Sequence, residues 1–166
     1  MYQNPIRSAF GVSSFGKAPI AAPEEDWTAD IAVIGAPFDQ SVTFRPGTRF
    51  GPRAIRDASH RYAFFNGESG FWDMRTETWR VQKRVVDCGD TDVVPLDANK
   101  CFANLTNAVR LIRKKRAFPV VLGGDHSITL PVLQAFDDAG KITATWAFSD
   151  SAGLIAQMGG RIVPVD

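Results

Sequence analysis

The segment Gly123-Gly124-Asp125-His126-Ser127 constrains the fold of this chain more than any other stretch. It follows an apolar run, residues 117–122, and precedes a helix-compatible segment, residues 128–136. A short apolar run closed by two glycines is typical of a buried parallel strand that reaches its carboxyl end. Open α/β sheets bind their ligands at that end. The segment therefore places one of the chain's two histidines where sheet proteins build their sites.

Strand-like and helix-like segments alternate along the rest of the chain. The predicted strands cover residues 30–35, 81–87, 118–122 and 141–148. The predicted helices cover residues 51–65, 99–116 and 129–137. Gly89 is expected to end the second strand, and residues 66–80 are expected to form an excursion between elements. The alternation predicts an α/β fold with a parallel sheet and right-handed crossovers.

Composition limits the class of protein. The chain has 166 residues, which favours one domain, and 45% of them are apolar. A net charge of +1 gives no reason to expect nucleic acid or an anionic membrane as a partner. No apolar run approaches the roughly 20 residues of a membrane span. Cys88 and Cys101 are too few for a disulfide framework, so we expect reduced thiols and a cytoplasmic location.

Two motifs, taken together and in this order, resemble the ureohydrolase family, which includes arginase, agmatinase and formiminoglutamase. The first is Gly35-Ala36-Pro37-Phe38-Asp39, followed by Arg45-Pro46-Gly47-Thr48-Arg49-Phe50-Gly51-Pro52; the second is the Gly123–Ser127 segment. The resemblance covers about residues 28–143 and is closer to agmatinases than to arginases proper. It implies a three-layer αβα fold, a centre of two Mn²⁺ ions, a small guanidino substrate and a homo-oligomer. The implied reaction is agmatinase-like: agmatine is hydrolysed to putrescine and urea.

The resemblance assigns roles residue by residue. His126 matches a manganese ligand of the family, and Asp125 and Ser127 match positions that support it. Asp150 falls roughly where the first aspartate of the family's next metal-binding motif would stand. Asp39 either caps its loop or lines the mouth of a substrate site, and the sequence leaves both interpretations open.

The sequence departs from the family pattern after about residue 143. No histidine follows His126, and only Asp150 matches any part of the next motif. We therefore expect an N-terminal arm at 1–29, the N-terminal half of a ureohydrolase domain at 30–143 and a divergent tail at 144–166, as in a truncated chain. The alternative to an enzyme is a non-catalytic fragment, or a pseudoenzyme, that acts by association with another subunit. Asp90 and Asp92 are interpreted as loop caps rather than metal ligands.

Overall fold

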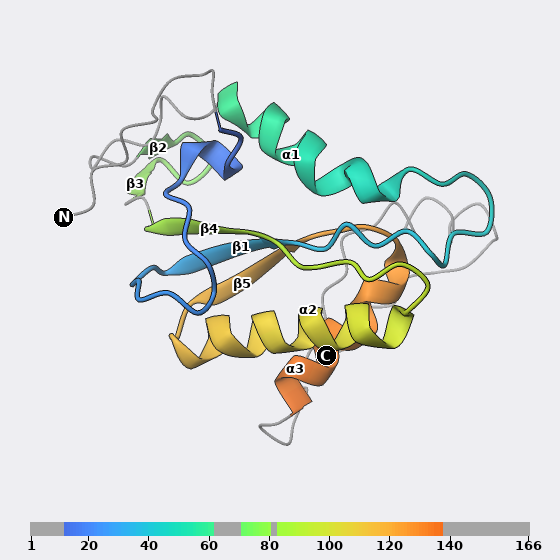
Figure 1. Cartoon of the computed structure of the whole chain (residues 1–166). Coiled ribbons are helices and arrows are strands. Elements are labelled where there is room, and N and C mark those ends of the chain that lie inside the picture. The colour runs from blue at the N-terminus through green and yellow to red at the C-terminus, as the bar shows by residue number, and fades with distance from the viewer. Residues whose placement is uncertain (1–11, 62–70, 81–82, 138–166) are drawn as a thin grey trace, which may run out of the picture.

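A three-stranded parallel sheet forms the centre of the molecule. The structure is a computed structural model that describes residues 12–61, 71–80 and 83–137 (Figure 1). The strands β1 (Ile31–Gly35), β4 (Val85–Asp90) and β5 (Phe118–Leu122) lie in the order β4-β1-β5. Both pairings of β1 are parallel, with Ile31 opposite Val85 on one side and Phe118 on the other. The parallel α/β arrangement predicted from the alternation is therefore confirmed.

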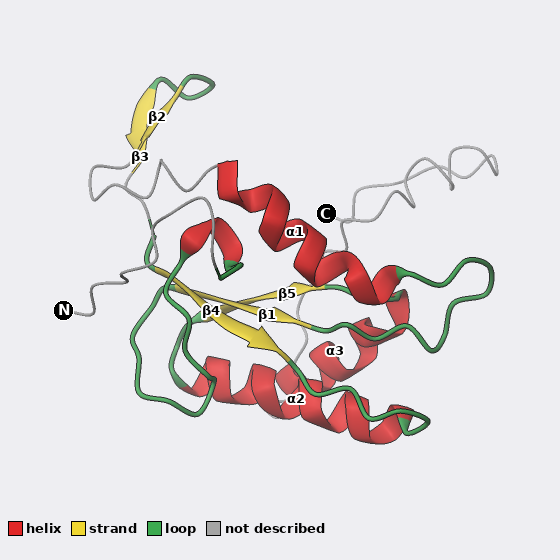
Figure 2. Cartoon of the chain, turned by 45° about the horizontal axis from the view of Figure 1, so that its top comes forward, coloured by secondary structure: helices red, strands yellow, loops and turns green. Residues whose placement is uncertain are grey.

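Helices cover both faces of this sheet. The helix α1 (Gly51–Ser59) lies over one face, whereas α2 (Ala98–Lys114) and α3 (Thr129–Asp137) lie over the other (Figures 1 and 2). Proline stands in the first turn of α1, where its missing N–H costs no hydrogen bond. At the start of α2, the Asp97 carboxylate accepts a hydrogen bond from the Lys100 amide at 2.9 Å. The expected three-layer αβα architecture is thus present. Within the described ranges, no helix is both long and apolar enough to cross a bilayer.

The main core lies between the sheet and α2. Leu105, Val109 and Ile112 recur at helical spacing and are almost completely buried. They pack against residues from alternate positions of the two adjoining strands, which are Ala32, Ile34, Val86 and Cys88. Because side chains alternate along a strand, residues between these positions face α1 instead. Asp87 is one of them, and it is 1% exposed.

The second strand differs from its prediction. It begins at Val85 rather than at 81 and continues through Gly89 to Asp90. Between Val33 and Gly35 the pairing steps from Asp87 to Asp90, so β4 carries one extra residue. Gly89 has φ +73°, a backbone conformation that glycine adopts without strain. The glycine thus forms a β-bulge and does not end the strand, and Asp90 is not part of a loop.

Other boundaries also differ from the expectations. The helix predicted over 51–65 is an α-helix only to Ser59, and residues 62–70 lie outside the described part. Within the predicted excursion, β2 (Phe71–Asp73) and β3 (Thr78–Arg80) form an antiparallel hairpin. The strand predicted at 141–148 and the tail at 144–166 lie outside the described residues.

The described part of the N-terminal arm packs on the sheet. It contains a single 3-10 turn, η1 (Phe15–Lys17). The Asp87 amide donates to the Pro19 carbonyl at 2.8 Å, and the Ala21 amide donates to the Asp87 carbonyl at 3.1 Å. Ile20 therefore forms a parallel bridge with Asp87 on the outer side of β4.

Candidate metal-binding turn

The Gly123–Ser127 turn leaves the carboxyl end of β5 and leads into a 3-10 helix, η4 (His126–Ile128), that continues as α3. The Asp125 carboxylate caps this helix because its Oδ1 accepts from the Ser127 amide at 3.0 Å and also from the Ser127 hydroxyl. Asp125 is 6% exposed, whereas the His126 side chain is exposed. The turn therefore presents the imidazole at the surface, at the carboxyl end of the strand, where the sequence predicted it.

The loop that follows β1 lies directly against this turn. The Asp125 amide donates to the Phe38 carbonyl at 2.8 Å, and the Ser41 amide donates to Asp125 Oδ2 at 2.9 Å. At Gly124 the two backbones touch: a Cβ on this residue would lie 2.1 Å from the Phe38 carbonyl oxygen. The two sequence motifs are thus brought together. Both oxygens of Asp125 hold the turn in place, and no hydrogen bond joins them to the imidazole among the described residues.

Asp39 organises the loop between β1 and α1. Its side chain is 2% exposed and accepts hydrogen bonds from the Gly47 amide at 2.7 Å, the Thr48 hydroxyl at 2.9 Å and the Arg49 Nε at 2.9 Å. The Arg49 hydrogen bond, helped by the donors of Gly47 and Thr48 against the effect of burial, lowers the pKa of Asp39 to about 2. The capping interpretation of Asp39 matches these contacts, and a role at a substrate mouth stays a prediction.

The described residues do not make up a centre for two manganese ions. Across 12–61, 71–80 and 83–137, no three side chains of His, Cys, Asp or Glu come together as metal ligands would. Mn²⁺ bound by nitrogen and oxygen ligands needs several such groups around each ion. His126 alone cannot supply them, and Asp150 lies outside the described residues. The assignment of His126 as a ligand therefore stays a prediction from the resemblance.

An ion cluster that the sequence analysis missed lies between α1 and β4. Arg56 donates from Nε to Asp87 Oδ2 at 2.7 Å, from Nη2 to Asp87 Oδ1 at 2.9 Å and from Nη1 to Asp90 Oδ1 at 2.6 Å. Asp90 was interpreted as a loop cap; it is instead the last residue of β4, where its carboxylate accepts a hydrogen bond from Arg56. A signal was present in the sequence: Asp87 stands between Val86 and Cys88 in a strand expected to be buried, and buried charges are paired.

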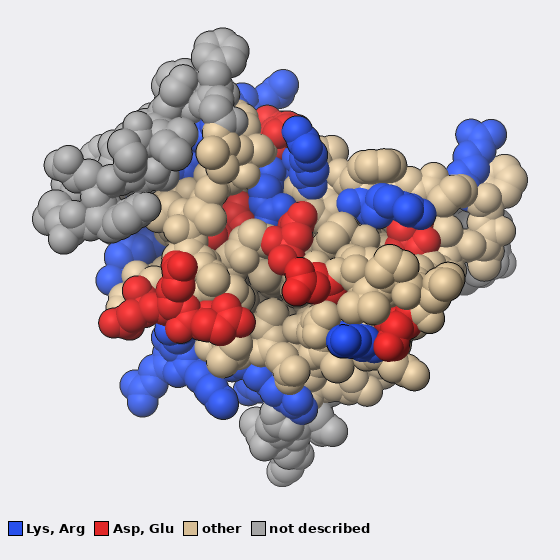
Figure 3. Space-filling model, viewed as in Figure 1, with Lys and Arg blue, Asp and Glu red and all other residues tan. Residues whose placement is uncertain are grey.

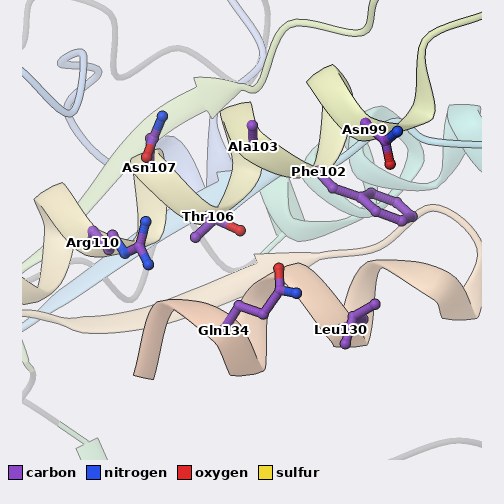
Figure 4. Close-up of a pocket in the computed structure, with 8 residues that line it drawn as sticks. All are labelled: Asn99, Phe102, Ala103, Thr106, Asn107, Arg110, Leu130 and Gln134. Atoms are coloured by element: carbon purple, nitrogen blue, oxygen red, sulfur yellow. The ribbon is translucent and has the colours of Figure 1, made fainter. Parts of the chain in front are cut away.

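A separate groove of about 580 Å³ runs between α2 and α3 (Figure 4). Its lining combines amide side chains with apolar ones; it consists of Asn99, Phe102, Ala103, Thr106, Asn107, Arg110, Leu130 and Gln134. None of the residues assigned to a site by the sequence analysis lines this groove, so it is distinct from the candidate metal-binding turn.

Comparisons with known proteins agree with this geometry. A sequence model described as "Arginase family" matches residues 29–147. Putative agmatinase 1 of Schizosaccharomyces pombe is 31% identical over 148 residues, which cover 78% of this chain and 37% of that protein. A crystal structure of a hypothetical agmatinase from Burkholderia thailandensis superposes with a TM-score of 0.64 at 31% identity, over 78% of this chain and 39% of that one.

A formiminoglutamase variant from Trypanosoma cruzi, whose crystal structure was determined with Mn²⁺, matches at 25% identity and a TM-score of 0.54. The match covers 68% of this chain and 36% of that protein. The fold and the motif-bearing turn thus define an α/β protein of the ureohydrolase kind. The chain belongs to the arginase family. It spans well under half of the length of the relatives it matches.

Proposed function

We propose that this chain supplies the N-terminal part of an agmatinase-like ureohydrolase unit, which hydrolyses a linear guanidino compound with release of urea. Agmatine is the proposed substrate, Mn²⁺ the proposed cofactor and His126 the proposed ligand on this chain. The observation that carries the proposal is the apposition of the two family motifs, through the 2.8 Å hydrogen bond from the Asp125 amide to the Phe38 carbonyl. A homo-oligomer and a cytoplasmic location belong to the same proposal.

Manganese would supply Lewis acidity and an activated water in such a unit. The described residues would position one ligand of such a centre: Asp125 and the loop 36–41 hold the turn in place, and the turn presents the His126 imidazole. A neutral imidazole is a common metal ligand, so His126 fits one position of the proposed centre. Because the described residues offer no other grouped ligands, we expect the 166-residue chain alone to release no urea from agmatine with added Mn²⁺.

The role of His126 can be tested without activity. Mn²⁺ is paramagnetic and broadens the NMR signals of groups that bind it, and the chain has only two histidines to compare, His60 and His126. We expect the imidazole signal of His126 to broaden at a lower Mn²⁺ concentration than that of His60. Equal broadening of the two signals would remove His126 from the proposed centre. A His60→Gln variant assigns the signals.

The expected inactivity of the chain alone is tested separately by a urea assay with agmatine and Mn²⁺. Urea above background in the purified chain, lost in His126→Ala, would show that the remaining ligands come from elsewhere, for example from a partner chain. Metal analysis distinguishes the second candidate, a non-catalytic fragment that acts by association. About two manganese ions per chain would support an enzyme. The lack of grouped ligands in the described part favours the second candidate.

A further inference from the structure

Arg56 ties the middle of α1 to the carboxyl end of β4. Its side chain is 6% exposed, and that of Asp87 is 1% exposed. In addition to its bonds with the two carboxylates, the guanidinium donates from Nη2 to the Gly89 carbonyl at 2.7 Å. The planar fork of arginine suits such a bidentate pairing, which a lysine cannot reproduce. The contact therefore fixes the orientation of α1 as well as its distance from the sheet.

The charges make this contact difficult to replace. Burial alone disfavours the guanidinium charge, but the hydrogen bonds and negative charges of Asp87 and Asp90 outweigh it and raise the pKa of Arg56. The Asp87 carboxylate also accepts from the Phe15 amide at 2.7 Å and the Gly89 amide at 2.9 Å. On the surface around this region, in the view shared by Figures 1 and 3, acidic and basic side chains are interspersed. Removal of Arg56 would leave Asp87 buried without its counter-ion.

The first turn of α1 lies against the ends of the other two strands. A Cβ on Gly51 would lie 2.7 Å from the carbonyl oxygen of Gly123, in the turn that carries His126. A Cβ on Gly35, at the end of β1, would lie 3.0 Å from the Pro52 Cβ and 1.8 Å from Asp90 Oδ1. Protein interiors this closely packed transmit small displacements. Movement of the first turn of α1 towards the sheet would therefore push against the backbone at Gly123.

The opposite side of the turn is held by the loop after β1. The hydrogen bonds of Asp125 with Phe38 and Ser41 fix that side. The turn is therefore clamped between this loop and the first residue of α1. Arg56 lies five residues beyond Gly51 on the same helix, about 7.5 Å along its axis.

We infer that Arg56 is a positioning residue for His126: by pairing with Asp87 and Asp90 it holds α1 against Gly123, and so sets the place of the metal-binding turn. The importance of that place for catalysis rests on the proposed function. The mechanical connection from Arg56 to the turn does not, and it is measured independently of any metal.

The test compares Arg56→Met with Arg53→Met. Arg53 lies on the same helix, but its side chain is 82% exposed and 3.9 Å from Asp57. In Arg56→Met we expect the imidazole NMR signal of His126 to shift, and the Asp125 amide to exchange with solvent about tenfold faster or more. Arg53→Met should change neither. The amides of Val109 and Ile112 in α2 report general stability, and they should be less affected than Asp125.

Two further variants cover the case in which Arg56→Met does not fold. Asp90→Asn keeps the buried pair of Arg56 with Asp87 and should give the same changes at His126 and Asp125 at smaller size. Arg56→Lys keeps the charge and should restore part of the Asp125 protection. An unchanged His126 signal in a folded variant, or an equal loss of protection in α2 and at Asp125, would overturn the inference. If Mn²⁺ fails to broaden His126 but these changes occur, His126 is removed from the proposed metal centre and the positioning role stands.

Discussion

Gly124 and Phe38 meet backbone to backbone: a Cβ on Gly124 would lie 2.1 Å from the Phe38 carbonyl oxygen and 2.7 Å from its amide nitrogen. The neighbouring Gly123 has far more room, since the nearest atom to its Cβ would be Ile128 Cδ1 at 3.3 Å. The two glycines of the motif therefore have different tasks. Gly124 permits the contact between the two family motifs, whereas position 123 tolerates a small side chain.

This difference predicts that Gly124→Ala destabilises the chain by about 1–3 kcal/mol or more, because the atoms in its way belong to the backbone and cannot rotate aside. Gly123→Ala is the matched control and should cost less than about 1 kcal/mol, because the end of an isoleucine side chain can adjust. Urea denaturation of both variants measures the free energy of unfolding. Equal losses would show that the contact with Phe38 does not limit position 124.

The lowered pKa of Asp39 predicts that the stability contributed by its loop depends on pH. Its folded value of about 2 lies below the ordinary 3.8, so its stabilising contribution is complete above pH 3.8. That contribution is lost as the pH falls from 3.8 through about 2, when the carboxylate takes up a proton and its hydrogen bonds with Gly47 and Arg49 weaken. We expect Asp39→Asn to flatten the stability profile in this acidic range. The same acid dependence in wild type and variant would contradict the assignment.

The thiol of Cys88 should be unreactive in the folded protein. Burial, followed by the nearby Asp87 charge, raises its pKa to about 12. At about pH 8 only about one thiol in ten thousand is then the nucleophilic thiolate. In a Cys101→Ser background, we expect Ellman's reagent to react with Cys88 only after unfolding in guanidinium chloride. Rapid reaction without denaturant would mean that Cys88 is accessible.

The exposed Phe118 at the start of the outer strand β5 predicts that the chain self-associates. The Phe118 side chain is 67% exposed, and β5 pairs only with β1 among the described residues. Unpaired strand edges with apolar side chains associate, and lysine on such an edge opposes this. We expect the purified chain to elute as oligomers or aggregates, and Phe118→Lys to shift it towards monomer in size-exclusion chromatography. Leu130→Lys, at a 55% exposed helical position, should have little effect. A wild-type monomer at all concentrations would exclude this association.

Local patterns were sufficient to predict the sheet and the turn. The apolar run before Gly123 and the helix-compatible segment after it predicted β5 and α3, and the alternation of elements predicted a parallel sheet. The two family motifs both follow predicted strands, and the structure brings them together. These features depend on periodicity and on short-range turn chemistry, which a sequence shows directly.

The sequence could not show which charges meet across the fold. Arg56 and Asp87 are 31 residues apart, and their pairing depends on α1 crossing the sheet at one particular place. Gly89 was misinterpreted for a related reason: a glycine near a strand end is expected both at a turn and at a bulge, and only the register with β1 separates them. The contacts of Asp39 with Gly47 and Thr48 similarly required the path of the loop.

The bridge between Ile20 and Asp87 makes the two outer strands of the sheet differ in how readily they could accept a further strand. On the β4 side, the arm already occupies the hydrogen-bonding groups of Asp87, so a new strand would first have to displace it. On the β5 side, no described residue takes that position. Any enlargement of the sheet, by more of the same polypeptide or by another molecule, therefore has a direction: it proceeds outward from β5, next to the strand that delivers His126.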